Sequence, residues 1–401
     1  DLGFHREAME CISGFIKLRP SDVALIAKAA SLCSKMEDYP AAVEYAGLLV
    51  LLEPENLHWS RLLVEQYSLN GDLSLAMDEQ QDILARNTLP EIGDWLTMAD
   101  LALKAGNLEK AMDACNAVLA AEPENAIALG HLGKAYMEKG DIDQAIQYLS
   151  RATLIAPEMD VPWLNLVEAL RRKNEPEKAY DSLRSAVLAS PHSPMINFEL
   201  AKACLEKGAK AEALPYLKKA ARLLPDSLPV VLELVKALSE LGHAVDAKEI
   251  IESSRAKWPG QPELAYAHAG ILQDEGDQQA AIRAYETAIA GKPGQLEWII
   301  GYAESLLGDN GDFILGKNKV LSQASLKSAR EAIERSDSIP DSRRDILLAE
   351  LHLASGNYDV ACQIYQKLRD MPSDSKNEWL WRMQTGLAKA ALALGQNDVA
   401  L

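Results

Sequence analysis

The stretch from Pro123 to Pro157 reads PENAIALGHLGKAYMEKGDIDQAIQYLSRATLIAP, with a proline at each end. Apolar side chains recur at helical spacing on both sides of Gly140: Leu129, Leu132 and Tyr136 before it, and Ala145, Leu149 and Ala152 after it. Glycine accepts the left-handed backbone that ends a helix, and proline cannot continue one. The stretch therefore predicts two amphipathic helices joined by a tight turn, with small residues at Gly133 and Ala145 that let them cross closely.

The same pattern of prolines and glycines continues along the chain. Prolines recur at one constant interval, at Pro123, Pro157, Pro191, Pro225, Pro259 and Pro293. Glycines keep this interval at Gly106, Gly140, Gly208, Gly242 and Gly276, with Asn174 in the remaining place. A fixed period in the range of roughly 20–50 residues is the signature of a repeat array. The sequence thus predicts an all-α fold of stacked helix hairpins, in which each repeat has a first and a second helix.

The residue types within each period resemble the tetratricopeptide repeat. One matching unit runs Trp163, Leu166, Leu170, Ala179, Leu183, Ala186, Pro191. The next unit continues with Leu200, Ala201, Ala213, Leu217, Ala220 and Pro225. The resemblance implies a right-handed α-solenoid, or superhelix, of 34-residue antiparallel hairpins. It also implies that the first helices line a concave groove that binds a partner protein.

The repeat pattern covers nearly all of residues 1–401, which we expect to form a single solenoid segment of a longer protein with about ten full hairpins. A lone second helix is expected from Gly3 to Arg19, and a truncated repeat from Trp381 to Leu401. Neither carries the polar face of a capping helix, so both are expected to meet something else. An insertion near residues 309–324 interrupts the pattern.

Composition narrows the function. The net charge is −18, from 59 acidic and 41 basic residues, which disfavours binding to nucleic acid or anionic lipid. No apolar stretch is long enough to span a bilayer. The five cysteines are scattered and form no C-x-x-C pair, which favours a reducing compartment. We expect a cytoplasmic protein, with the periplasm as the alternative.

Catalytic, metal and cofactor motifs are not predicted. The run from Gly311 to Asn318 resembles a phosphate-binding loop, but Asn318 replaces the hydroxyl that holds magnesium, and no strand is expected before it. We expect this insertion to be a long loop between helices, and the alternative is a loop that contacts a partner. The seven histidines are scattered, and none pairs with cysteine or carboxylate at metal-ligand spacing. We therefore expect no enzymatic activity and no cofactor.

The predicted partner-binding residues lie on the groove face of the first helices. They are Leu164, Met195, Phe198, Lys202, Leu205, Leu232, Lys236, Tyr266, Trp298 and Tyr302. This stripe suits an apolar helix or an extended peptide, and its lysines suit acidic flanks. Two alternatives stay open. The apolar residues could pack on neighbouring repeats, and Lys134, Lys202 and Lys236 could pair with Glu138, Glu206 and Glu240 four residues on.

Three functions fit these observations. The first is a scaffold that binds a partner segment in its groove through Phe198, Tyr266, Trp298 and Tyr302 as anchors. The second is the regulatory or sensor arm of a larger enzyme, such as a protease, a glycosyltransferase or a signalling ATPase. The third is a structural protein that self-associates through its uncapped ends.

Overall fold

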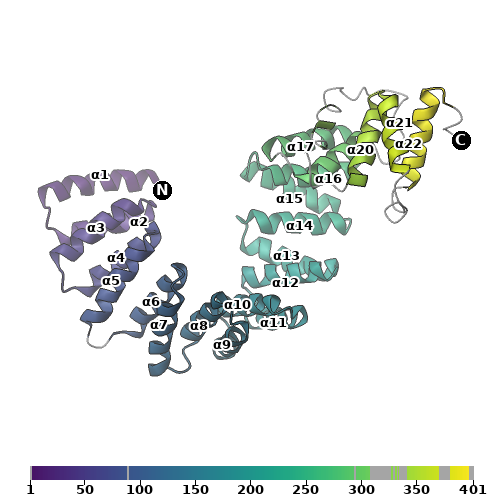
Figure 1. Ribbon diagram of the computed structural model, residues 1–401. Helices are drawn as coiled ribbons and strands as arrows, with labels where there is room; N and C mark the ends of the chain where they lie inside the picture. The colour runs from purple at the N-terminus through teal and green to yellow at the C-terminus, as the bar shows by residue number, and fades with distance from the viewer. Residues whose placement is uncertain are drawn as a thin grey trace. The chain divides into compact units, whose positions relative to one another are not determined.

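The computed structural model describes residues 2–87, 90–292, 295–307, 327, 330, 331, 333, 341–369 and 380–396. The predicted insertion at 309–324, including the phosphate-loop-like run, lies outside these residues. Every element among them is a helix, so the all-α prediction is confirmed. Figure 1 shows the helices as successive antiparallel pairs.

The structure falls into two compact units, residues 1–203 and 204–401, each of which is described by itself. The helices of unit 1 are α1 (Leu2–Leu18), α2 (Val23–Lys35), α3 (Tyr39–Leu52), α4 (Leu57–Asn70), α5 (Leu73–Arg86), α6 (Ile92–Lys104), α7 (Leu108–Ala121), α8 (Ala126–Lys139), α9 (Ile142–Ile155), α10 (Asp160–Arg172) and α11 (Pro176–Ala189). The helix α12 (Pro194–Glu206) contains the boundary. Unit 2 holds α13 (Lys210–Leu223), α14 (Leu228–Glu240), α15 (Ala244–Lys257), α16 (Pro262–Asp274), α17 (Gln278–Gly291), α18 (Leu296–Leu307), α20 (Asp341–Ala354), α21 (Tyr358–Arg369) and α22 (Leu380–Ala393).

First helices carry even numbers and second helices odd numbers from α2 to α17, and α1 occupies the place of a second helix. The helix starts keep the repeat, because α8, α10, α12, α14, α16 and α18 begin at the same interval that separates the prolines. Polar caps begin many of them. The Asn125 side chain, for example, accepts a hydrogen bond from the Ala128 N–H at 3.0 Å.

Tight turns join the two helices of a hairpin. Gly140 ends α8 with φ of +92°, as the sequence predicts. In the described part of the chain, two turns place a residue other than glycine in the left-handed region, Glu37 with φ of +61° and Asn174 with φ of +62°. Asparagine tolerates that conformation better than most residues, which accounts for its place in the glycine series.

Small residues allow close packing inside each hairpin. A Cβ atom added to Gly133 of α8 would lie 2.5 Å from Leu149 Cγ and 3.3 Å from the Ala145 carbonyl oxygen of α9. Ala145 and Leu149 are fully buried. The predicted close crossing at Gly133 and Ala145 is therefore confirmed.

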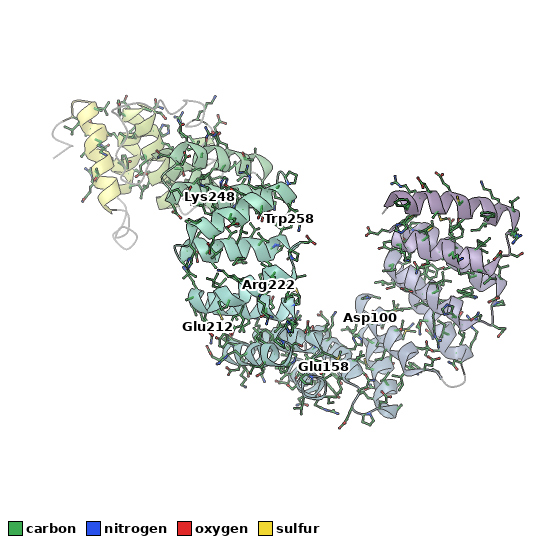
Figure 2. The ribbon with its side chains drawn as sticks, turned by 180° about the vertical axis from the view of Figure 1, so that it is seen from behind. Asp100, Glu158, Glu212, Arg222, Lys248 and Trp258 are labelled. Carbon is green, nitrogen blue, oxygen red and sulfur yellow. The ribbon has the colours of Figure 1, made fainter. Side chains whose placement is uncertain are left out.

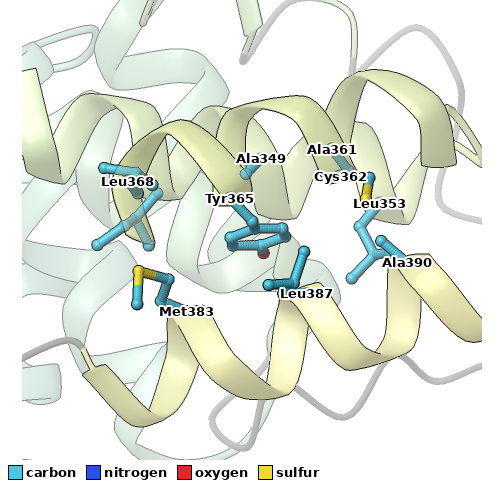
Figure 3. Close-up of a cluster of buried hydrophobic side chains, with 10 residues drawn as sticks. Ala349, Leu353, Ala361, Cys362, Tyr365, Leu368, Met383, Leu387 and Ala390 are labelled. Carbon is cyan, nitrogen blue, oxygen red and sulfur yellow. The ribbon is translucent and has the colours of Figure 1, made fainter. Parts of the chain in front are cut away.

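In the C-terminal part of unit 2 a tyrosine takes the place that Leu149 has in α9, the eighth residue of the second helix. Tyr365 of α21 is fully buried among side chains of α20, α21 and α22 (Figure 3). Gly386 of α22 faces its ring, because a Cβ there would lie 2.3 Å from Tyr365 Cζ. The missing side chain on one helix makes room for the ring on the other.

Candidate protein-binding surface

Three exposed apolar side chains occupy the same place in three successive first helices of unit 1. They are Ile127 of α8, Val161 of α10 and Met195 of α12, which are 42%, 61% and 43% exposed. Each is the second residue of its helix. Large apolar side chains in such an array are candidates for a binding surface. We call these three residues the apolar row.

Contacts between helix starts hold the apolar row together. A Cβ added to Gly130 of α8 would stand 3.5 Å from Pro162 Cγ of α10, so these helices run close to each other. Ser193, just before α12, donates a hydrogen bond to the Asp160 carboxylate at the start of α10 at 2.5 Å. Val161 and Met195 directly follow these two contacts. Leu164, one turn further along α10, is half-buried and extends the apolar surface.

A charged cluster lies on the same helices α10 and α12. The Glu199 carboxylate accepts hydrogen bonds from Arg171 Nη1 at 2.9 Å and from Lys202 Nζ at 2.6 Å. Burial raises the pKa of Glu199, but the hydrogen bonds and charges of Lys202 and Arg171 outweigh it and leave this pKa below its usual value. The Arg171 and Lys202 side chains stay 31% and 36% exposed. We call Arg171 and Lys202, with Glu199, the cationic cluster, because it carries one net positive charge.

Lys202 does not form the expected pair with Glu206. Its Nζ binds Glu199 one turn earlier and lies 5.4 Å from the centre of the Phe198 ring. Glu240 pairs with Lys210 of α13 at 3.0 Å, so the expected pair with Lys236 is also replaced. In both cases the observed ion pair differs from the one expected between residues four apart on the same helix. Lys202 binds a residue three positions earlier, and Glu240 binds a lysine of the neighbouring helix α13.

Three of the predicted anchors are buried. Phe198 is 9% exposed, Trp298 8% and Tyr302 3%. The Trp298 ring stacks on Tyr266 with ring centres 5.3 Å apart, and the Tyr302 hydroxyl donates to Glu286 Oε1 at 2.9 Å. These three side chains pack within the repeats, and their contact with a partner stays a prediction.

The prediction also placed Trp298 and Tyr302 out of register with the earlier repeats. The helices α16 and α18 begin at Pro262 and Leu296, so the counterpart of Tyr266, four residues into α16, is Ile300 in α18. The predicted Trp298 lies two residues before this equivalent position. The repeat that follows it is interrupted, so the sequence offers no regular turn after α18 from which to set the register. A shift of two residues turns a helical side chain by roughly 200° around the axis. Ile300, at the equivalent position, is itself only 6% exposed, so packing between repeats buries this part of α18 in either register.

The remaining predicted residues of unit 2 keep some surface. Leu205, Leu232 and Tyr266 are half-buried, and Lys236 is exposed. No exposed apolar row like that of unit 1 includes them among the described side chains. Their role in partner binding stays a prediction.

The sequence analysis missed a groove between α4 and α6 in unit 1. It has a volume of about 540 Å³, and its lining includes Arg61, Glu65, Glu91, Asp94, Asp100 and Lys104. The buried Asp94 carboxylate accepts from Arg61 Nε at 2.8 Å and from Arg61 Nη2 at 2.9 Å. Gln80 of α5 donates to the Asp94 carbonyl oxygen at 2.8 Å and fixes the floor. The available signal was an arginine and an aspartate at nearly one repeat's spacing in successive first helices.

Reactive groups do not gather among the described side chains of either unit. Among the described residues, no group of three His, Cys, Asp or Glu side chains could hold a metal ion. Four cysteines are buried, and burial raises the pKa of Cys115 to about 12, so its thiol stays protonated. No helix in the described part of the chain is long and apolar enough to cross a membrane. Figure 2 shows side chains on both units, with Asp100 of the groove labelled on α6.

Comparisons with known proteins agree with the fold. Two tetratricopeptide repeat models match the sequence, one at residues 102–170 and 205–271 and the other at 164–227. No curated protein sequence matches significantly. Both matching family models describe tetratricopeptide repeats.

Three solved structures show the extent of the structural likeness. YrrB, a tetratricopeptide repeat protein with an unusual peptide-binding site, is 16% identical over 47% of this chain and 98% of its own, with a TM-score of 0.43. Yeast Tom70 is 15% identical over 99% of this chain and 93% of its own, with a TM-score of 0.38. The human IFIT1 dimer is 16% identical over 71% of this chain and 68% of its own, with a TM-score of 0.43.

The matched repeats lie in the middle of the chain, and hairpins of the same construction continue on both sides of them. Residues 102–271 of the chain are tetratricopeptide repeats.

Proposed function

We propose that this protein is a scaffold that binds an apolar segment of a partner protein on the first helices α8, α10 and α12. The observation that carries the proposal is the apolar row. Burying its side chains releases about 25 cal/mol for each Å² of apolar surface. A soluble repeat protein exposes such residues at a cost in solubility, and a partner that covers them removes that cost.

The spacing of the row defines the partner segment. Packed helices lie about 8–10 Å apart. Seven residues of a helix rise roughly 10.5 Å, and three residues of an extended chain span roughly 10 Å. A helix with apolar residues seven apart, or an extended peptide with apolar residues three apart, would place one side chain on each member of the row.

The cationic cluster supports an acidic flank on that segment. Arginine has five N–H donors and lysine three, so Arg171 and Lys202 keep donors after both have bound Glu199. A partner carboxylate can use these donors without displacing Glu199. Rim charges of this kind govern specificity and association rate more than affinity.

The test is a pull-down from native lysate, read by mass spectrometry, with two matched double variants. Val161→Glu/Met195→Glu places charge on the apolar row. Leu154→Glu/Leu188→Glu places the same charges on residues that are 83% and 84% exposed on the second helices α9 and α11. Circular dichroism checks that both variants fold.

We expect the first variant to lose a partner that the wild type and the second variant retain. A partner held equally by all three proteins would exclude the apolar row as its binding site. Loss of the partner by both variants would indicate nonspecific hydrophobic binding or a binding site on the second helices. Either of these results would overturn the proposal.

A further inference from the structure

The groove between α4 and α6 carries more negative than positive charge. Its charged lining consists of four carboxylates and two cations. Both cations are already paired. Arg61 binds Asp94 and also Glu91, at 2.9 Å, while Lys104 binds Asp100 at 2.7 Å. Glu65 is exposed, and no ion pair to it is seen among the described side chains. The groove thus keeps an excess of two negative charges.

The groove is also large enough and apolar enough to seat a side chain. Its volume of about 540 Å³ falls in the range of roughly 300–1,000 Å³ that is usual for ligand sites. Val64, Leu69 and Leu101 supply apolar lining between the charges, and Leu69 is 47% exposed. A lysine or arginine combines an apolar stem with a charged head, which is the combination that this lining complements.

The groove and the apolar row lie on consecutive first helices. The groove involves α6, which packs against α8, the first helix of the apolar row. The cationic cluster follows on α10 and α12. The first helices of unit 1 therefore present, in order, an acidic groove, an apolar row and a cationic cluster.

We propose that the groove between α4 and α6 binds lysine or arginine side chains at one end of the partner segment. The segment is then basic at one end, apolar in the middle and acidic at the other end. This inference rests on the proposed function, because it assigns a second contact to the same partner. It also means that the segment binds in one direction only, since reversing it would bring like charges together at both ends.

The geometry sets the length of the segment. The three steps from α6 to α12 cover about 27 Å at about 9 Å per step. An extended peptide needs about 8 residues for that distance, and a helix about 18. The basic end and the acidic end should be separated by one of these lengths.

The experiment is selection of random displayed peptides on the purified full chain, at low salt because surface charge pairs are screened. Three proteins are compared. They are the wild type, the groove variant Glu65→Gln/Asp100→Asn, and the control variant Asp82→Asn/Asp113→Asn, which removes two exposed carboxylates from the second helices α5 and α7. One wild-type-selected peptide is then synthesised and its Kd measured on each protein.

We expect wild-type selection to enrich peptides with basic residues at one end of an apolar core and acidic residues at the other. The groove variant should bind the synthetic peptide about three- to five-fold more weakly, as expected for exposed charge pairs. The control variant should bind it as the wild type does. Replacing the basic residues of the peptide with glutamine should remove the difference between the groove variant and the wild type.

The outcomes separate this inference from the proposed function. Apolar peptides without a basic end, which bind both variants equally and fail on Val161→Glu/Met195→Glu, would overturn the inference and leave the proposed function standing. Peptides with a basic end that lose equal affinity on the groove and control variants would show a general effect of net charge and would also overturn it. Selection of no peptide would overturn both.

Discussion

At the scale of single residues, Glu199 decides what the cationic cluster offers a partner. Its carboxylate binds Arg171 from the preceding first helix and Lys202 from its own helix. One negative charge thus joins two helices and leaves one positive charge for a partner. Removing Glu199 would place two cations side by side, so the residue serves packing and recognition together.

His131 carries a pH prediction at the same scale. Burial lowers the pKa of this histidine below its usual 6.5, Lys134 and Lys104 lower it further, and Asp100 opposes them. Below about pH 6.5, His131 therefore binds a proton more readily in the unfolded chain than in the folded chain. Protonation then favours unfolding, and the free energy of unfolding falls as the pH drops. We expect His131→Asn to lose less stability than the wild type between about pH 7.5 and about pH 5.5, measured by urea unfolding.

The comparison isolates His131 because other groups titrate equally in both proteins. His268, whose pKa is also lowered by burial and by Arg255, is unchanged in the variant. An identical loss of stability in both proteins would show that the His131 pKa is the same in the folded and unfolded chains. That result would contradict the assigned burial effect.

At the scale of elements, α8 contains two glycines with opposite surroundings. At Gly133 an added Cβ would meet Leu149 Cγ at 2.5 Å, whereas at Gly130 it would meet Pro162 Cγ at an ordinary 3.5 Å. Gly133→Ala should destabilise the protein by ~1–3 kcal/mol through overpacking. Gly130→Ala should stabilise it by up to ~1 kcal/mol, because alanine favours helix. Urea unfolding of both variants, on the same helix, checks the difference.

The two substitutions control each other. A similar stability change in both would mean that helix propensity alone decides, and that the hairpin tolerates a side chain at Gly133. The close crossing of α8 and α9 would then not depend on the missing Cβ. Circular dichroism should show the same helix content for both folded variants.

Sequence alone predicted the helices well in the repeats that keep both the turn glycine or asparagine and the closing proline. The positions of Gly140 and Asn174 at turns and the burial of Ala145 and Leu149 follow from residue chemistry that acts within one hairpin. The burial of Trp298 and Tyr302 did not follow, because it depends on how the side chains of neighbouring repeats pack together. The α4–α6 groove was missed because it depends on how Arg61 and Asp94 meet across two hairpins.

At the scale of the whole molecule, contacts are local in sequence. Among the described helices, each substantial packing contact joins helices one or two places apart in the chain order, such as α6 with α7 and with α8. Arrays of this kind are stabilised by each repeat and its neighbours rather than by one central core. A local defect should therefore remain local.

Leu149→Ala tests this locality. Leu149 of α9 is fully buried, and its loss should destabilise its surroundings by ~2–5 kcal/mol. We expect faster amide hydrogen exchange in α8, α9 and α10, and unchanged exchange in α2–α4 and in α14–α17, measured by mass spectrometry on peptide fragments. Leu154→Ala on the same helix, at a site that is 83% exposed, is the control and should leave all helices unchanged. Equal acceleration throughout the chain would instead show one cooperative unit, since a sum of neighbouring repeats cannot transmit the loss of one leucine to α2 and α17.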